Sequence, residues 1–354
     1  MRLIVRDHVM NSKRLVIKVF EGEGEEVVPL HIESDCKNEE ALLGDIVGVG
    51  AKVVEWRKFY RKGGPFARRP HEKLSVWINR VNLEEYEWPE VDEVVRYAVE
   101  VFEERAKKYS ESKFIVYKVL GPTETSESFF TRGLSRIRTS LNQVVHEFGF
   151  ATFLLLNVKK ACKLFNKISR YVLELIKAGA EIEYVDAVRV ADDVATYGRL
   201  LYPQWFIKEH YLKWHKEFSR VIKKSGKYAI LHCDGDILIN SLREIFRIYD
   251  GIHPLDLRPR FSTKDARRWI NSIVRAREIV GSRVVFFTGI PIELLFNDSI
   301  GVEDIYDIVR MFLETHGREM LILATTHSNY PGRSYKEPLV MRKLEAINRL
   351  RKAR

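Results

Sequence analysis

The sequence predicts an α/β protein folded as a (β/α)8 barrel, the TIM-barrel class, and three observations carry this prediction. The chain has 354 residues, which suits one large α/β domain. Hydrophobic residues make up 45% of it, enough for a large buried core. Short apolar runs alternate with longer stretches of helical periodicity, and this order is typical of parallel strands joined by crossover helices. We therefore expect residues 1–354 to form a single barrel domain.

The first element is a helix that Asn11 or Ser12 can cap and that ends near Phe20, before Gly22 and Gly24. It makes residues 1–26 an N-terminal helical extension. Eight strand candidates follow, at 27–32, 45–55, 114–120, 182–190, 228–232, 250–253, 284–289 and 320–324. The expected helices lie at 88–109, 135–148, 154–177, 203–224, 264–280, 302–315 and within 342–354. Eight such units favour a closed barrel over an open sheet.

Several classes of protein are excluded by composition. No apolar run reaches the roughly 18 residues of a membrane span, and the first residues contain no apolar secretory core. The three cysteines, Cys36, Cys162 and Cys233, form no C-x-x-C pair, which is typical of a reducing compartment. No G-x-G-x-x-G motif follows an early strand, so a dinucleotide site has no support. We expect a soluble cytoplasmic protein without a membrane partner.

The charge balance is basic, with 59 Lys and Arg against 49 Asp and Glu. A nucleic-acid partner, an anionic substrate and the highly charged surface of a heat-adapted protein all agree with this excess. Nucleic-acid binding ranks last, because the aromatic residues form no array suited to stacking on bases. The basic segment 56–70, which includes Arg57, is either a lid over an anionic substrate or a solvated loop.

Titratable side chains follow almost every predicted strand. In a (β/α)8 barrel these positions share one face, where chemistry collects. We take four of them as substrate-binding candidates: Glu124, His253, Asp256 and, after the second unit, Arg57.

The strongest local pattern is His232-Cys233-Asp234-Gly235. Residues two apart on an extended segment point to the same side, so His232 and Asp234 can chelate a divalent metal together. His327, which follows the eighth strand, is the expected third ligand. The alternatives are that His232 and Asp234 contact substrate, or that they hydrogen-bond each other for structural reasons. Cys233 points away and is expected to be a buried filler.

Asp192 and Asp193 form an acidic pair after the fourth strand. Paired acids can hold a cation, orient a basic group or share a proton. Asp is also a favoured helix cap. Both interpretations can hold at once, with one acid capping a helix and the other facing the site. We take Asp192, Asp193 and Asp234 as catalytic candidates.

These motifs together resemble the uroporphyrinogen decarboxylase superfamily, which includes corrinoid-dependent methyltransferases. The matching elements are Asp192-Asp193, Gly198, Tyr202-Pro203, His232-Cys233-Asp234-Gly235 and, earlier in the chain, Gly121-Pro122 with Arg132-Gly133. The resemblance covers roughly residues 12 to 350. It implies one (β/α)8 barrel with its site at the carboxyl ends of the strands, in agreement with the strand count.

The resemblance implies an enzyme that moves a methyl group from a corrinoid protein partner to a thiol-like small molecule. His232, Asp234 and His327 would hold a divalent metal such as zinc. The alternative is a uroporphyrinogen-type decarboxylase that needs no cofactor. The family's decarboxylases carry arginines after the first strand, and residues 29–35 contain none. A non-catalytic binding protein is the third possibility, and crowding of titratable groups at the strand ends argues against it.

Overall fold

The structure is a computed structural model. It describes residues 11–23, 26–34, 43–51, 64–69, 71–130, 136–138, 144–146 and 149–352. Arg57, Gly133 and most of the basic segment 56–70 lie outside the described residues.

The eight predicted strands are all present. They are β1 (Leu30–His31), β2 (Ile46–Ala51), β3 (Phe114–Leu120), β6 (Ala187–Ala191), β9 (Tyr228–His232), β10 (Gly251–His253), β11 (Val285–Ile290) and β12 (Leu321–Thr325). They form an eight-stranded sheet in the order β1-β12-β11-β10-β9-β6-β3-β2. The pairs β1–β12, β10–β11, β11–β12 and β6–β9 are parallel. The order and the helices between the strands are those of a (β/α)8 barrel, which confirms the predicted fold class.

The chain divides into two compact units. Unit 1 contains the described parts of Met1–Gly48, Ala106–Val116 and Asp250–Arg354, and unit 2 contains those of Val49–Arg105 and Tyr117–Tyr249. That residues 1–354 form a single domain stays a prediction. Each unit is described by itself below.

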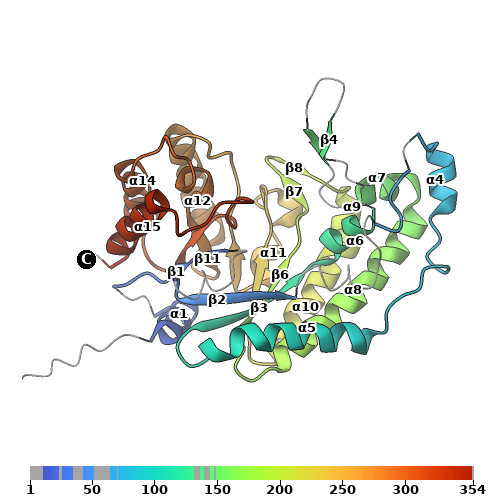
Figure 1. Cartoon of the computed structure of the whole chain (residues 1–354), viewed down its shortest axis with the longest axis horizontal. Coiled ribbons are helices and arrows are strands. Elements are labelled where there is room, and N and C mark those ends of the chain that lie inside the picture. Colours follow the sequence, from blue (N-terminus) through green and yellow to red (C-terminus); the bar gives the residue numbers. More distant parts are fainter. Residues whose placement is uncertain are drawn as a thin grey trace, which may run out of the picture. The chain divides into compact units, whose positions relative to one another are not determined.

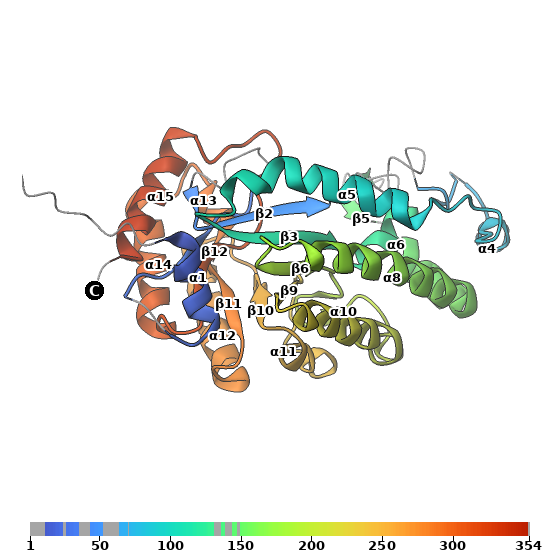
Figure 2. The same cartoon turned by 90° about the horizontal axis from the view of Figure 1, so that it is seen from below.

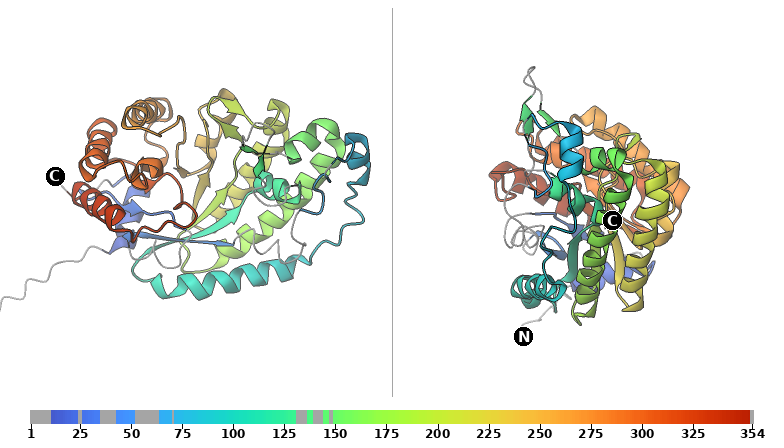
Figure 3. Two further views of the ribbon diagram at one scale, coloured as in Figure 1. Left: turned by 45° about the horizontal axis from the view of Figure 1, so that its top comes forward. Right: turned by 90° about the vertical axis from the view of Figure 1, so that its right-hand side faces the viewer.

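Unit 1 contains β1, β10, β11, β12 and the helices α1 (Ser12–Phe20), α12 (Thr263–Val280), α13 (Ile292–Leu295), α14 (Val302–His316) and α15 (Pro338–Leu350). The predicted N-terminal helix is confirmed, because Asn11 caps α1 by accepting a hydrogen bond from the amide of Lys13. Helices α14 and α15 lie side by side, as the orange and red ribbons show (Figures 1 and 3). Their buried faces contribute to an apolar core, in which Phe312 of α14 stacks on Trp269 of α12.

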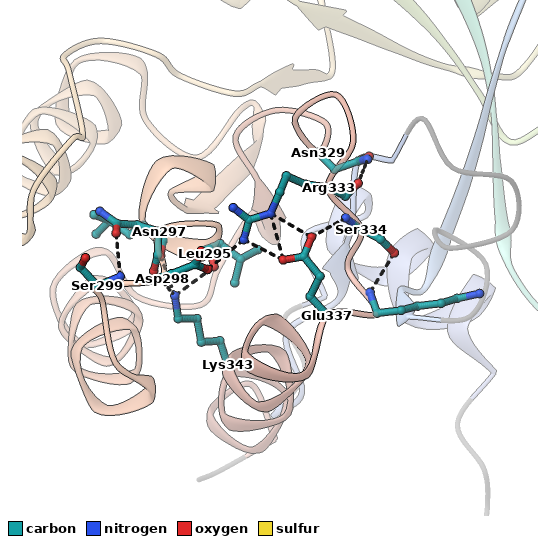
Figure 4. Close-up of polar contacts among 11 residues, drawn as sticks. Leu295, Asn297, Asp298, Ser299, Asn329, Arg333, Ser334, Glu337 and Lys343 are labelled. Carbon is teal, nitrogen blue, oxygen red and sulfur yellow. Dashed lines mark hydrogen bonds and ion pairs between the residues drawn. The ribbon is translucent and has the colours of Figure 1, made fainter.

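Two buried charges fix the helices of unit 1. Asp45 accepts hydrogen bonds from the Leu30 amide (2.8 Å), the Ser12 hydroxyl (2.7 Å) and Arg351 (2.6 Å), so it joins α1, β1 and the end of α15. Lys343 of α15 is completely buried, and its Nζ donates to three backbone carbonyls at the end of α13 (Figure 4). A helix end leaves such carbonyls without intrahelical donors, so Lys343 replaces the missing hydrogen bonds.

Unit 2 contains β6, β9 and most of β3, together with helices that cover them. The main helices are α4 (Leu74–Arg80), α5 (Val91–Ala106), α6 (Pro122–Phe130), α7 (Gly149–Leu156), α8 (Val158–Glu181), α9 (Gln204–Phe206), α10 (Leu212–Lys224) and α11 (Ile245–Ile248). Helices α8 and α10 run side by side (Figure 2). Each carries one apolar stripe that faces the core, as their periodicity predicts.

The structure corrects one helical expectation in unit 2 and refines another. The stretch 135–148 is not a helix, because β4 (Arg136–Arg138) and β5 (Val144–His146) pair as an antiparallel hairpin. The β-branched residues Ile137, Val144 and Val145 favour strands over helices. The prediction followed the helical spacing of the apolar residues and did not weigh this preference. The stretch 203–224 is helical but interrupted by a π-helical turn over Ile207–Tyr211, between α9 and α10.

Candidate functional site: an acidic cluster at the ends of β6 and β9

The carboxyl ends of β6 and β9 lie next to each other in unit 2. The two strands are parallel, and their register pairs Ala191 with His232. The amide of Asp192 then donates to the carbonyl of His232 at 2.9 Å. Residues that follow these two strands are therefore held together by backbone hydrogen bonds.

Asp193, His232 and Asp234 form a cluster whose ligand atoms all lie within 4.8 Å of one another. The amide of Asp234 donates to Asp193 Oδ1 at 2.7 Å, which fixes the two acids relative to each other. His232 Nε2 lies 3.7 Å from Asp234 Oδ1, too far for a hydrogen bond. Two ligands of one zinc-like ion are separated by about 3.4 Å, since each lies about 2.1 Å from the metal. The donor set and its spacing therefore fit a divalent metal ion.

Gly235 shapes the loop that carries Asp234. Its φ angle is 85°, in the left-handed region that glycine adopts readily. A Cβ atom there would lie 2.4 Å from the carbonyl oxygen of Ala195. Glycine is thus required both for the sharp turn and for the close approach of the loop after β6, as the sequence predicted for the turn.

Asp192 is completely buried and does not belong to the cluster. Its Oδ1 accepts the backbone amides of Thr123 (2.8 Å) and Glu124 (3.0 Å) and the Thr123 hydroxyl. Its carboxylate therefore caps the amino end of α6. Asp192 and Asp193 take the two roles that the sequence allowed, one capping a helix and the other facing the cluster. A direct catalytic role of Asp192 stays a prediction that this geometry does not favour.

The second carboxylate oxygen of Asp192 is held by a buried chain of side-chain hydrogen bonds through His215 and Tyr249. His215 Nε2 lies 3.0 Å from Asp192 Oδ2, and His215 Nδ1 lies 2.6 Å from the hydroxyl of Tyr249. Sequence reasoning missed His215. The available signal was a histidine on the apolar stripe of α10, between Tyr211 and Phe218, because a polar residue on a buried stripe needs a partner.

Glu124 lies in the first turn of α6 and makes a side-chain hydrogen bond with Asp193. Burial raises the pKa of the Glu124 carboxyl well above its usual range, and the neighbouring charges of Asp193, Asp192 and Asp234 raise it further. The Glu124 carboxyl therefore retains its proton at pH values where an exposed glutamate is ionised. This places one predicted substrate-binding residue beside the cluster.

Sequence reasoning missed Glu127 but described Cys233 correctly. Glu127 was missed: burial raises the pKa of its carboxyl to about 7, while its oxygens accept the amides of Phe150 and Ala151 at 2.9 Å. It caps the start of α7, in the same way that Asp192 caps α6. Cys233 is completely buried, as expected of a filler, and burial raises the pKa of its thiol well above the usual range.

The remaining predicted residues lie in unit 1. His253 is completely buried, and its Nε2 lies 2.8 Å from the carbonyl oxygen of Thr325. Asp256 is paired with the buried Arg260, which also pairs with Glu293. His327 follows β12 and is exposed to solvent, with Nδ1 3.3 Å from the carbonyl of Ser328. The metal triad of His232, Asp234 and His327 stays a prediction. The structure gives His232 and Asp234 a partner within unit 2, Asp193.

Comparisons with known proteins add no family. No protein-family model matches the chain, and no curated protein matches it. Among solved structures, it is similar to a B12-independent methionine synthase from Shewanella sp. W3-18-1, with 12% identity, a TM-score of 0.38, and coverage of 75% of this chain and 67% of that one. It is also similar to an endo-1,4-β-D-mannanase from Thermotoga petrophila RKU-1, with 12% identity, a TM-score of 0.41, and coverage of 86% of this chain and 88% of that one. A GH113 β-1,4-mannanase is similar with 11% identity, a TM-score of 0.43, and coverage of 93% of this chain and 100% of that one.

These similarities are too slight to assign a family or an activity, so the resemblance to the uroporphyrinogen decarboxylase superfamily stays a prediction from the motifs. Within the described residues, no helix combines the length and the apolar character that a membrane crossing requires.

Proposed function

We propose that this chain is a metal-dependent enzyme whose divalent ion is bound by Asp193, His232 and Asp234. The observation that carries the proposal is the convergence of their ligand atoms within 4.8 Å at the ends of two paired strands. One imidazole nitrogen and two carboxylate oxygens suit zinc and the other first-row divalent ions. When bound, such an ion lowers the pKa of a coordinated thiol, hydroxyl or water.

The chain's own residues prepare this site. The Asp234 amide donates to Asp193 Oδ1, which holds the Asp193 carboxylate beside Asp234. Glu124 holds Asp193 by a side-chain hydrogen bond, so both acids have fixed orientations. Side chains of His232 and Asp234 are 13% and 31% exposed, so a small molecule can reach the cluster from solvent.

For the reaction, we propose transfer of a methyl group from a corrinoid protein to a thiol-like small molecule. The support is the motif resemblance, together with a group of potential metal ligands that includes His232 and Asp234, two of the three residues that the resemblance implies. Decarboxylation of a polycarboxylate is less well supported by the structure. Asp193, Asp234 and Glu124 concentrate acidic groups at the site, where a polyanionic substrate would require cations.

The metal site is tested by zinc content after dialysis. Asp193→Asn and His232→Gln should each lose about one equivalent of zinc per chain. Asp236→Asn is the matched control, because this acid lies in the same loop but outside the cluster. His327→Gln separates the two triads. Unchanged zinc in Asp193→Asn and loss in His327→Gln would overturn the site proposed here in favour of the sequence-predicted one.

The reaction is tested separately on zinc-loaded protein. Methylcobalamin and a panel of small thiols should give a methyl thioether and demethylated cobalamin, and His232→Gln should abolish this product. Zinc binding without any methyl transfer across the panel would refute the reaction while leaving the metal site intact.

A further inference from the structure

Asp192 connects the backbone segments that carry the metal cluster proposed above. Its amide donates to the carbonyl of His232 at 2.9 Å, which joins β6 to β9. The hydroxyl of Tyr211 donates to the carbonyl oxygen of Asp192 at 3.3 Å, so it holds the peptide bond that leads into Asp193. Asp192 is therefore hydrogen-bonded to one proposed metal ligand and covalently linked to another.

The side chain of Asp192 positions α6 beside the same cluster. Its Oδ1 accepts the amide of Glu124 at 3.0 Å, and the Glu124 side chain in turn hydrogen-bonds Asp193. The Thr123 hydroxyl lies between the Asp192 carboxylate and the Asp193 carbonyl oxygen, 3.2 Å from the latter. A Cβ atom on Gly121 would lie 2.2 Å from Asp192 Cγ, so the turn before α6 is shaped to this carboxylate. A rotation of the carboxylate would displace α6 and the backbone of Asp193.

His215 fixes the orientation of that carboxylate. Its Nε2 lies 3.0 Å from Asp192 Oδ2, and because an ionised carboxylate can only accept, Nε2 carries the hydrogen. Nδ1 then has the lone pair and accepts the hydroxyl hydrogen of Tyr249 at 2.6 Å. The hydrogen bonds run in one direction, from Tyr249 through His215 to Asp192, and bonds in such a chain strengthen one another.

The chain of hydrogen bonds lies in an apolar environment. His215 and Asp192 are completely buried, and only 2% of Tyr249 is exposed. The His215 ring packs on Tyr211, with ring centres 3.9 Å apart, and edge-on against Phe218, at 5.5 Å. The ring and the carboxylate therefore keep one orientation, because turning either would leave a buried polar group without its partner.

Metal affinity depends on the groups that orient the ligands as well as on the ligands themselves. Asp193 takes its position from Asp192, both through the backbone and through Glu124. We propose that His215, supported by Tyr249, is a positioning residue of the metal site. It acts through Asp192 to hold Asp193 in the geometry that binds the ion. Since the metal site is itself proposed above, the role of His215 depends on it.

The test is the affinity of chelator-stripped protein for Zn²⁺. His215→Phe fills a similar volume without a hydrogen bond and should bind Zn²⁺ about 10-fold more weakly than wild type. His215→Gln should restore most of the affinity, because its amide nitrogen can donate to Asp192 in place of Nε2. Tyr249→Phe removes a single hydroxyl and leaves the bond between His215 and Asp192, so its loss should be smaller.

Two further measurements separate positioning from a general loss of stability. Lys343→Met removes three buried hydrogen bonds in unit 1, and its Zn²⁺ affinity should equal that of wild type. Co²⁺ reports ligand geometry through its visible absorption. The Co²⁺ spectrum of His215→Phe should differ from that of wild type, and the spectrum of His215→Gln should match it.

The metal site and the positioning role can fail separately. Absence of Zn²⁺ from wild type, or its retention by Asp193→Asn, would overturn the metal site. Loss of Zn²⁺ from Asp193→Asn with wild-type affinity in His215→Phe would leave the site intact and overturn the positioning role. An equal loss of affinity in Lys343→Met would overturn it too. If His215→Phe does not fold, wild-type affinity and an unchanged Co²⁺ spectrum in Tyr249→Phe would have the same consequence.

Discussion

Glu127 should make the stability of this protein fall as the pH rises from acidic to neutral. Burial raises the pKa of its carboxyl from 4.5 to about 7. The unfolded chain releases this proton near pH 4.5, whereas the folded chain retains it up to about pH 7. Because the folded state binds more protons in this interval, the contribution is complete below pH 4.5 and is lost as the pH passes 7.

The size of the effect follows from the shift. A displacement of 2.5 pKa units corresponds to about 3 kcal/mol of pH-dependent free energy of unfolding. Glu127→Gln removes this dependence, since glutamine does not titrate. The variant also loses part of the cap on α7, because an NH2 group, which cannot accept, replaces one of the two side-chain oxygens that accept the Phe150 and Ala151 amides. That loss costs about 1 kcal/mol at every pH.

Urea unfolding of wild type and Glu127→Gln at intervals from pH 4.5 to 8 measures the difference directly. The variant should be the less stable protein at pH 4.5 and should gain about 3 kcal/mol on wild type by pH 8. Glu87→Gln, which removes an exposed glutamate, should run parallel to wild type throughout. A constant difference between wild type and Glu127→Gln across this range would refute the reasoning.

Three other changes test contacts described above. Asp192→Ala leaves His215 and two α6 amides buried without the hydrogen-bond acceptor that Asp192 provides. The free energy of unfolding in urea should therefore fall by about 4 kcal/mol. Lys343→Met removes the donor to three backbone carbonyls, two in α13 and one just after it, and the free energy of unfolding should fall by roughly 3 kcal/mol in the same assay. Burial lowers the pKa of His316 from 6.5 in the unfolded chain to about 4, so the stability that the neutral imidazole contributes is lost as the pH falls from 6.5 to 4. In thermal melts, the melting temperature of His316→Gln should therefore fall less between pH 7 and pH 4.5 than that of wild type.

The fold was predictable because its signal is local. Each strand is a short apolar run, and β3 and β9 have the predicted boundaries. The hairpin of β4 and β5 was missed for a local reason too, since the spacing of apolar residues favoured a helix and the β-branched residues favoured strands. Only tertiary structure decides between two such signals.

The site was predictable only in part, because it depends on which strand ends are neighbours. The spacing of His232 and Asp234 predicted that they would act together. The choice of His327 as their partner came from a rule that treats all eight strand ends as equivalent. The register that pairs Ala191 with His232 explains why Asp193 lies close to them. The sequence allowed one acid of the Asp192–Asp193 pair to cap a helix but did not indicate which, and no sequence signal indicated that Glu127 caps α7.

The alternation of an extended chain places an acid beside each of two histidines, at different distances. Residues two apart face the same way, which pairs His232 with Asp234 and also His31 with Glu33. Asp234 Oδ1 lies 3.7 Å from His232 Nε2, beyond hydrogen-bond distance, whereas Glu33 Oε2 lies 2.9 Å from His31 Nε2, within it. The first spacing suits two ligands of one cation, and the second suits a direct hydrogen bond. The same pattern in sequence thus yields different chemistry, and the distance between the acid and the imidazole decides which.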